Sequence, residues 1–220
     1  MTGGRSSPNL GVAVLLTAAL TCLTTAGCAR SVDGTPTAAT VHALPHSADD
    51  LGRLVVTDVP SGLPRLPDDT LQPPAGAKSV DDIADYSDDP EHEHGVLEQY
   101  GYRYGWERFW GTGSGPMTGV FVDQFDGRAG AAAYARDLAR NDAEHYDAAV
   151  HENPPQLPGG CRMLTVDAPA AQAKLGGPAA MAWCEHGPFS VSVTAVAGSL
   201  GSAEEEVRAV VHAQLDRLPR

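Results

Sequence analysis

A run of alternating aromatic residues, YGYRYGWERFW at residues 100–110, constrains the fold more than any other feature of the chain. The rings share one parity, and mostly glycine and charged residues take the other, which is the period of a strand with one apolar face. Such rings are costly to leave in water, so we expect them to be mainly core, with the tryptophan end deeper than the tyrosine end. The aromatic parity, broken only by Arg108, comprises Tyr100, Tyr102, Tyr104, Trp106 and Trp110.

The segments that follow predict the rest of a sheet. A glycine-rich turn leads to a second strand at residues 117–125, which makes a hairpin with the aromatic strand. A helix opening at residues 126–127, strands at residues 161–166, 179–184 and 189–197, and a C-terminal helix with a capping box from Ser202 to Glu205 come next. Residues 51–59 predict a short strand, and residues 71–93 an acidic surface loop with a helical turn at its end. This order indicates an α+β fold, an antiparallel sheet with two main helices packed on it.

The N-terminus predicts export. Residues 1–27 carry a single cation, Arg5, followed by an apolar run that ends in small residues, which is typical of a signal peptide. The sequence LTTAGC places Ala26 and Gly27 before Cys28, as in the bacterial lipobox, where the cysteine thiol is acylated and becomes the new N-terminus. Thr25 departs from the usual leucine of that motif. Simple secretion and an uncleaved anchor therefore stay open as alternatives to lipidation of Cys28.

A change in composition after Cys28 indicates a linker and one domain. Residues 28–49 are dominated by small and polar residues with little to bury, so they predict a disordered, lipid-anchored tether. Residues 50–219 have the length of a single α+β domain with a proper core.

Two cysteines remain in the exported domain, Cys161 and Cys184. An oxidising compartment favours a disulfide between them. A thiolate metal site is the alternative, but neither cysteine belongs to a C-x-x-C pair.

The charge of the chain limits its partners. A formal net charge of −13 makes nucleic acid a poor partner. It also disfavours binding to headgroups through a basic patch, so membrane contact is expected through the lipid alone, with the domain on the extracytoplasmic face of the cell membrane.

Several segments together suggest a family. The lipobox-like Cys28, the polar tether, DVPSGLPRL at residues 58–66, the aromatic run and VFVDQFDGRAGAAAYARDL at residues 120–138 resemble the small exported lipoproteins of actinobacteria whose α+β domain is similar to the PsbP-like fold. The resemblance implies a domain that binds other proteins or ligands rather than one that performs one reaction. Function must therefore be argued from a site.

Candidate chemistry in the sequence is sparse. His92 and His94 lie two apart in EHEHG and would share one side of an extended segment, but a zinc or copper site needs further, distant ligands, so a solvated loop is favoured. No catalytic or cofactor motif stands out, and no cofactor is predicted. We expect a non-catalytic binding module that recognises an envelope protein or a small amphiphile, with any ligand groove bordered by Tyr100 and Tyr102. A cell-envelope hydrolase with an unrecognised site is the alternative.

Overall fold

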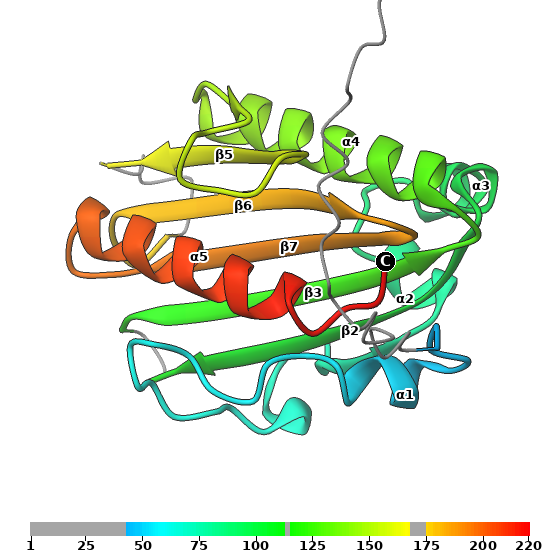
Figure 1. Ribbon diagram of the computed structural model, residues 1–220, viewed down its shortest axis with the longest axis horizontal. Coiled ribbons are helices and arrows are strands. Elements are labelled where there is room, and N and C mark those ends of the chain that lie inside the picture. The colour runs from blue at the N-terminus through cyan, green and yellow to red at the C-terminus, as the bar shows by residue number, and fades with distance from the viewer. Residues whose placement is uncertain (1–42, 113–114, 168–174) are drawn as a thin grey trace, which may run out of the picture. The chain divides into compact units, whose positions relative to one another are not determined.

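The computed structural model describes residues 43–112, 115–167 and 175–220. Within these residues, seven strands form one antiparallel sheet in the order β1-β2-β3-β7-β6-β5-β4, with α-helices packed against it (Figure 1). The predicted α+β class and antiparallel sheet are confirmed. The predicted signal peptide, Cys28 and the linker up to residue 42 lie outside the described residues.

The strands agree closely with the sequence pattern, and two long helices accompany three short ones. The strands are β1 (Gly76–Lys78), β2 (Tyr102–Gly111), β3 (Met117–Phe125), β4 (His151–Glu152), β5 (Cys161–Val166), β6 (Ala179–His186) and β7 (Phe189–Val196). The helices are α1 (Ala48–Gly52), α2 (Val80–Ala84), α3 (Pro90–Tyr100), α4 (Arg128–Tyr146) and α5 (Leu200–Leu215).

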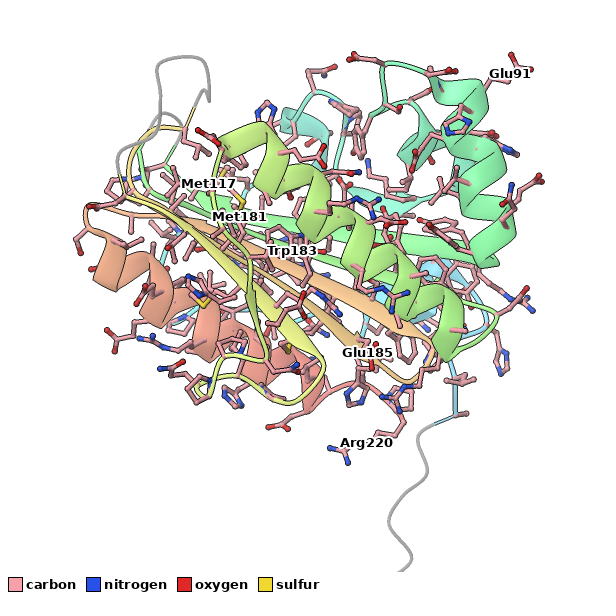
Figure 2. The ribbon with its side chains drawn as sticks, turned by 90° about the horizontal axis from the view of Figure 1, so that it is seen from above. Glu91, Met117, Met181, Trp183, Glu185 and Arg220 are labelled. Carbon is pink, nitrogen blue, oxygen red and sulfur yellow. A yellow bond between two sulfur atoms is a disulfide. The ribbon has the colours of Figure 1, made fainter. Side chains whose placement is uncertain are left out.

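The two long helices lie on opposite faces of the sheet (Figure 2). Helix α5 contacts β5, β6 and β7 on one face, which we call the α5 face. Helix α4 contacts β3, β5, β6 and β7 on the other, the α4 face, where α3 packs beside it. Strands β5, β6 and β7 therefore have helices on both faces.

The α5 face holds the main apolar core. The predicted apolar stripe of α5 is buried there, including Val207, Val210 and Val211, against valines of β3 and β7. The helix begins earlier than the sequence suggested. Its N-cap is Ser199, whose hydroxyl accepts from the Ser202 backbone N–H, so the predicted capping box at Ser202 is wrong.

A β-bulge in β2 divides the aromatic run between the two faces. Tyr102 is opposite Phe125 and Tyr104 is opposite Gln124, which leaves Arg103 as the extra residue. Tyr104 and Trp106 therefore pack on the α5 face, while Tyr102 packs on the α4 face with Phe125. Tyr100 is not in the strand at all, because α3 ends there and Gly101 turns the chain in the left-handed region (φ 73°).

The prediction that the rings are mainly core is met in part: Trp110 is buried, whereas Tyr102, Tyr104 and Trp106 are partly buried and pack against the core clusters. Trp110 is 1% exposed, whereas Trp106 is only partly buried at the margin of the α5-face core. The expected increase in burial from the tyrosine end to the tryptophan end holds only in part, because the bulge places Tyr102 on the other face. Arg108, which breaks the aromatic parity, is buried on the α5 face beside the tryptophans.

Residues 51–59 do not form the predicted strand. Helix α1 begins after the Ser47 N-cap, and an irregular segment follows it. The Arg108 guanidinium donates to the carbonyls of Gly52, Val55 and Val56 at 2.7–3.2 Å. Side chains of Arg217 and Gln214 bind the Leu54 carbonyl from the other side. Side-chain donors thus satisfy the backbone groups that a strand ladder would have used.

The N-terminal edge of the domain also lies a few residues before position 50. Pro45 is buried, and its carbonyl accepts hydrogen bonds from Tyr104 Oη at 2.7 Å and Gln124 Nε2 at 3.3 Å. The end of the expected linker is therefore part of the fold.

The acidic segment at residues 71–93 contains more structure than the predicted loop. It forms β1, α2 and the start of α3, with a capping box at Ser79 and Asp82 and with Pro90 in the first turn of α3 behind the Asp89 N-cap. The outer edge of β2 is covered by β1 and by residues 64–66, since Leu66 N donates to Phe109 O and Gly111 N donates to Pro64 O, both at 2.9 Å.

The predicted disulfide is present. Cys161 of β5 and Cys184 of β6 are direct partners in the strand register, and both are buried in the α5-face core. None of the helices in the described residues is long and apolar enough to cross a bilayer.

Candidate functional site

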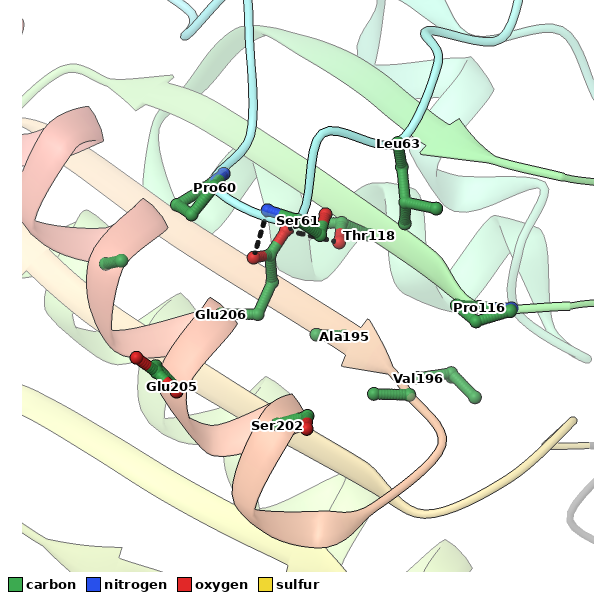
Figure 3. A pocket seen from close by; sticks show the side chains of 12 residues that line it. Pro60, Ser61, Leu63, Pro116, Thr118, Ala195, Val196, Ser202, Glu205 and Glu206 are labelled. Atoms are coloured by element: carbon green, nitrogen blue, oxygen red, sulfur yellow. Dashed lines mark hydrogen bonds between the residues drawn. The ribbon is translucent and has the colours of Figure 1, made fainter.

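A groove of about 510 Å³ lies at one end of α5, where the segment at residues 60–63 approaches β3 (Figure 3). Its buried carboxylate, Glu206, accepts hydrogen bonds from Ser61 N (2.9 Å), Ser61 Oγ (2.6 Å) and Thr118 Oγ1 (3.0 Å). Those three hydrogen bonds tie the segment to the helix and the sheet. The groove is therefore explained by structural bonding.

The predicted groove residues, Tyr100 and Tyr102, are placed apart. Tyr100 lines an open hollow of about 300 Å³ between α3 and α4, and its hydroxyl donates to Asp137. Tyr102 reaches beneath α4, where its hydroxyl donates to Asp123 at 3.2 Å. Tyr134 and Leu138 of α4 separate the two places, because they line both the hollow and a smaller cavity beneath it.

That smaller cavity, of about 190 Å³, is the most distinctive site in the described residues. It lies on the α4 face between α4, α2 and the sheet, and we call it the α4-face cavity. Its apolar lining comes from Ile83, Phe121, Tyr134, Leu138 and Trp183, and its polar lining from Tyr86, Glu107, Asp123, Asp142, Ser192 and Thr194. A largely apolar cavity with a few convergent polar groups is the usual form of a small-molecule site.

Asp123 is the central acid of the cavity. It lies in the middle of β3, is 4% exposed, and has Gly105 and Ser190 as its register partners on β2 and β7. A Cβ atom at Gly105 would come within 2.3 Å of Asp123 Oδ1 and 2.6 Å of Tyr102 Oη, so a glycine is required there. Burial, reinforced by the charge of Glu107, raises the pKa of Asp123 to about 8, against the hydrogen bond from Tyr102.

Glu107 is the second acid and is already paired. Its carboxylate lies 3.3 Å from Lys78 Nζ and accepts hydrogen bonds from Tyr86 Oη at 2.9 and 3.0 Å. Burial raises the pKa of Glu107, while the ammonium of Lys78 opposes that shift. Lys78 also donates to the Pro74 carbonyl. The buried ammonium of Lys78 beside the cavity is thus engaged by Glu107 rather than by Asp123.

Two serines of β7 supply hydroxyls that lack partners. Ser190 is fully buried and Ser192 is 7% exposed, and neither Oγ atom has a hydrogen-bond partner in the described residues. Ser192 lines the cavity directly. A buried hydroxyl left unsatisfied costs stability, so such groups are expected where something else binds.

The solvent side of the cavity is marked by Tyr86 and Asp142. Tyr86, just after α2, is 48% exposed even though its hydroxyl reaches the buried Glu107. Asp142 on α4 is partly exposed, and burial raises its pKa to about 6, with His145 opposing the shift. No histidine or cysteine lines this cavity among the described residues, so a serine–histidine or cysteine–histidine dyad is not assembled here.

The candidate metal ligands of the sequence do not meet further ligands. His92 and His94 lie in helix α3, where residues two apart point in different directions, instead of in an extended segment. His94 lies 3.3 Å from Asp81 and 3.9 Å from Glu98. Across the described residues, no group of three or more His, Cys, Asp or Glu side chains is placed to hold a metal ion.

Sequence reasoning missed the cavity because it gave the face of β2 opposite the rings a mostly polar character and named no element that covers it. Glu107 of β2, Asp123 of β3 and Ser192 of β7 lie on this one face of the sheet. The available signal was the segment at residues 79–100, whose capping residues Ser79 and Asp89 indicate two helices that could cover the polar face.

The described residues thus form an α+β fold that contains a small, acidic, partly apolar cavity, which is the candidate site. The chain belongs to the family described as Domain of unknown function (DUF7373) N-terminal, whose model matches residues 63–220. That match includes every residue of the α4-face cavity. No curated protein and no solved structure matches the chain.

Proposed function

We propose that the protein is a non-catalytic binding module, anchored by lipid at Cys28 on the extracytoplasmic face of the cell membrane, whose α4-face cavity takes a small amphiphile. The cavity carries this proposal, because it combines an apolar lining with a buried acid and a buried hydroxyl that has no partner. An envelope protein remains the other partner class, bound through the outer surface of the same domain.

The lipid anchor is supported by the sequence alone. LTTAGC and the polar tether after it have the order of residues found in exported lipoproteins, and the domain begins where that tether ends. We also propose a relationship to the exported actinobacterial lipoproteins with a PsbP-like domain, on the motifs at residues 58–66, 100–110 and 120–138.

Lipidation is tested by labelling. Expressed in an actinobacterial host with labelled palmitate, the full chain should incorporate the label, and Cys28→Ala should not. A wild-type chain without label would contradict lipidation and leave simple secretion or an uncleaved N-terminal segment as the alternatives.

Ligand binding is tested with small aromatic probes. Saturation-transfer NMR with benzyl alcohol and benzylamine should detect binding of at least one to the folded domain, weakened by Ser192→Val, which adds methyl groups to the cavity. Binding of neither probe, or binding indifferent to Ser192→Val, would remove the cavity as the ligand site. Ester hydrolysis lost in Ser192→Ala would favour an envelope hydrolase instead.

A further inference from the structure

The charges around the α4-face cavity are unbalanced. Glu107, Asp123 and Asp142 contribute three carboxyl groups to the lining, while the adjoining buried ammonium is that of Lys78, which lies on Glu107. Asp123 makes one hydrogen bond, from Tyr102 Oη, so most of its acceptor capacity is unused. A ligand with positive charge and N–H donors would complete this set.

The lining favours an organic cation over an inorganic one. Phe121, Tyr134 and Trp183 bring aromatic rings to the cavity, and such rings stabilise cations held over their faces. Ile83 and Leu138 add aliphatic surface that an apolar tail would cover. A divalent metal would need three or more oxygen or nitrogen ligands around one point, and the described residues contain no such group.

The volume and the unpartnered hydroxyl limit the ligand further. A dry cavity of roughly 150 Å³ accommodates benzene, so about 190 Å³ suits a molecule with a single ring or a short alkyl chain. Ser192 lines this space, and its Oγ, which has no partner among the described residues, can accept a hydrogen bond. A primary ammonium has three N–H donors, whereas a quaternary ammonium has none.

We propose that the α4-face cavity binds a small organic molecule with a primary ammonium group, which pairs with Asp123 and donates a hydrogen bond to Ser192 while its apolar part lies among the aromatic rings. This inference rests on the proposed function, because it names the ligand class of the same cavity.

Binding is expected to be linked to a proton. Since Asp123 is held largely protonated at neutral pH, pairing with an ammonium releases the carboxyl proton to the buffer, and affinity rises with pH toward about 8. The other ionisable groups at or beside the cavity are Lys78, Asp82, Tyr86, Glu93, Tyr102, Glu107, Tyr134, Asp142 and His145.

Calorimetry on the exported domain with three probes tests the proposal. Benzylamine, benzyl alcohol and benzoate share a ring and differ in charge. At pH 8 we expect benzylamine to bind about tenfold more tightly than benzyl alcohol, as a charge-assisted hydrogen bond implies, and benzoate to be weakest. Repeating the titration in buffers of different ionisation enthalpy at pH 7 should show proton release with benzylamine only.

Matched variants assign the effect to the cavity. Asp123→Asn keeps the shape of the side chain and should lower the affinity for benzylamine to nearly that for benzyl alcohol. Ser192→Ala removes one acceptor and should lower the affinity for benzylamine several-fold. Glu205→Gln removes an exposed carboxylate of α5, on the opposite face of the sheet, and should leave the affinity for each probe unchanged. Circular dichroism verifies that each variant is folded.

The outcomes separate the two proposals. Equal binding of benzylamine and benzyl alcohol, unchanged by Asp123→Asn, would overturn the ammonium assignment and leave a cavity for neutral amphiphiles. Tighter binding of benzoate would overturn it as well. Failure of all three probes to bind the wild type would overturn both the ammonium assignment and the cavity as a ligand site.

Discussion

The same strands form both faces of the sheet, but the two faces carry different kinds of side chain. On the α5 face, β3 and β7 present valines that pack against an apolar helix, and the charged groups there, such as Arg108 and Glu206, each make several hydrogen bonds. On the α4 face, the next residues of those strands are Asp123, Ser190 and Ser192, which are buried with unused bonding capacity. This difference fits the proposal that the α5 face mainly stabilises the fold, whereas the α4 face binds the ligand.

Substitutions at two neighbouring residues of β2 are expected to differ most in the free energy of unfolding that they cost. Trp110→Ala should destabilise the domain by about 3–5 kcal/mol, as large aromatic truncations in cores do. Phe109→Ala, one position away on the α4 face and only partly buried, should cost about half as much or less. Denaturant unfolding measures both. Equal losses would mean that the α4 face carries as much packing energy as the α5 face.

Removal of the disulfide in the α5-face core is expected to have the next largest effect on stability. Replacing Cys161 and Cys184 together by alanine should lower the free energy of unfolding by roughly 3 kcal/mol, because the unfolded chain loses a constraint. Thermal unfolding of the variant and of the oxidised wild type gives the difference. Two freely alkylated thiols in the exported wild-type protein would contradict the disulfide itself.

The pH dependence of stability should come from the α4 face. The pKa of Asp123 is about 8 in the folded protein and near 3.8 when unperturbed, so between these values the folded state holds a proton that the unfolded state has lost. Stability must therefore fall as pH rises through this range, by up to about 1.4 kcal/mol per pH unit, or roughly 2–3 kcal/mol from pH 5 to 7.

Asp123→Asn isolates this contribution from other titrating groups. The amide mimics the protonated acid and can still accept from Tyr102, so the variant should lose most of the decline. Parallel wild-type and variant curves of unfolding free energy against pH would show that Asp123 ionises normally in the fold.

The smallest effect compares two buried hydroxyls. Ser192→Ala removes a hydroxyl that has no partner and should leave the unliganded domain unchanged or up to about 1 kcal/mol more stable. Thr118→Val on the α5 face removes a donor to Glu206 and should cost about 1 kcal/mol. A loss for Ser192→Ala equal to that for Thr118→Val would assign Ser192 a structural bond.

The elements that depend on local periodicity were predictable from the sequence. Strands β3, β5, β6 and β7 and helix α4 lie where alternation and apolar stripes put them, and the pairing of Cys161 with Cys184 followed from their being the last two cysteines. The bulge at Arg103 was not predictable, because one extra residue leaves no mark in a pattern that reads equally well without it.

The site escaped prediction because it depends on tertiary burial. Asp123 was one carboxylate among many in the sequence, and only the packing of α4 and α2 over it makes it unusual. The expected groove at Tyr100 and Tyr102 drew on the strand pattern, which could not show that the two tyrosines end on different elements. Their hydroxyls serve Asp137 and Asp123, respectively.

The covered edge of β2 has a consequence for how partners can be recognised. Many proteins capture an extended peptide by adding it as a strand to a free sheet edge, and the same exposed edges promote aggregation. Here β1 and residues 64–66 already occupy the backbone groups along that edge. A partner could add a strand to β2 only by displacing this segment. Copies of the protein that are crowded together on a membrane surface would then have little tendency to associate edge to edge through β2.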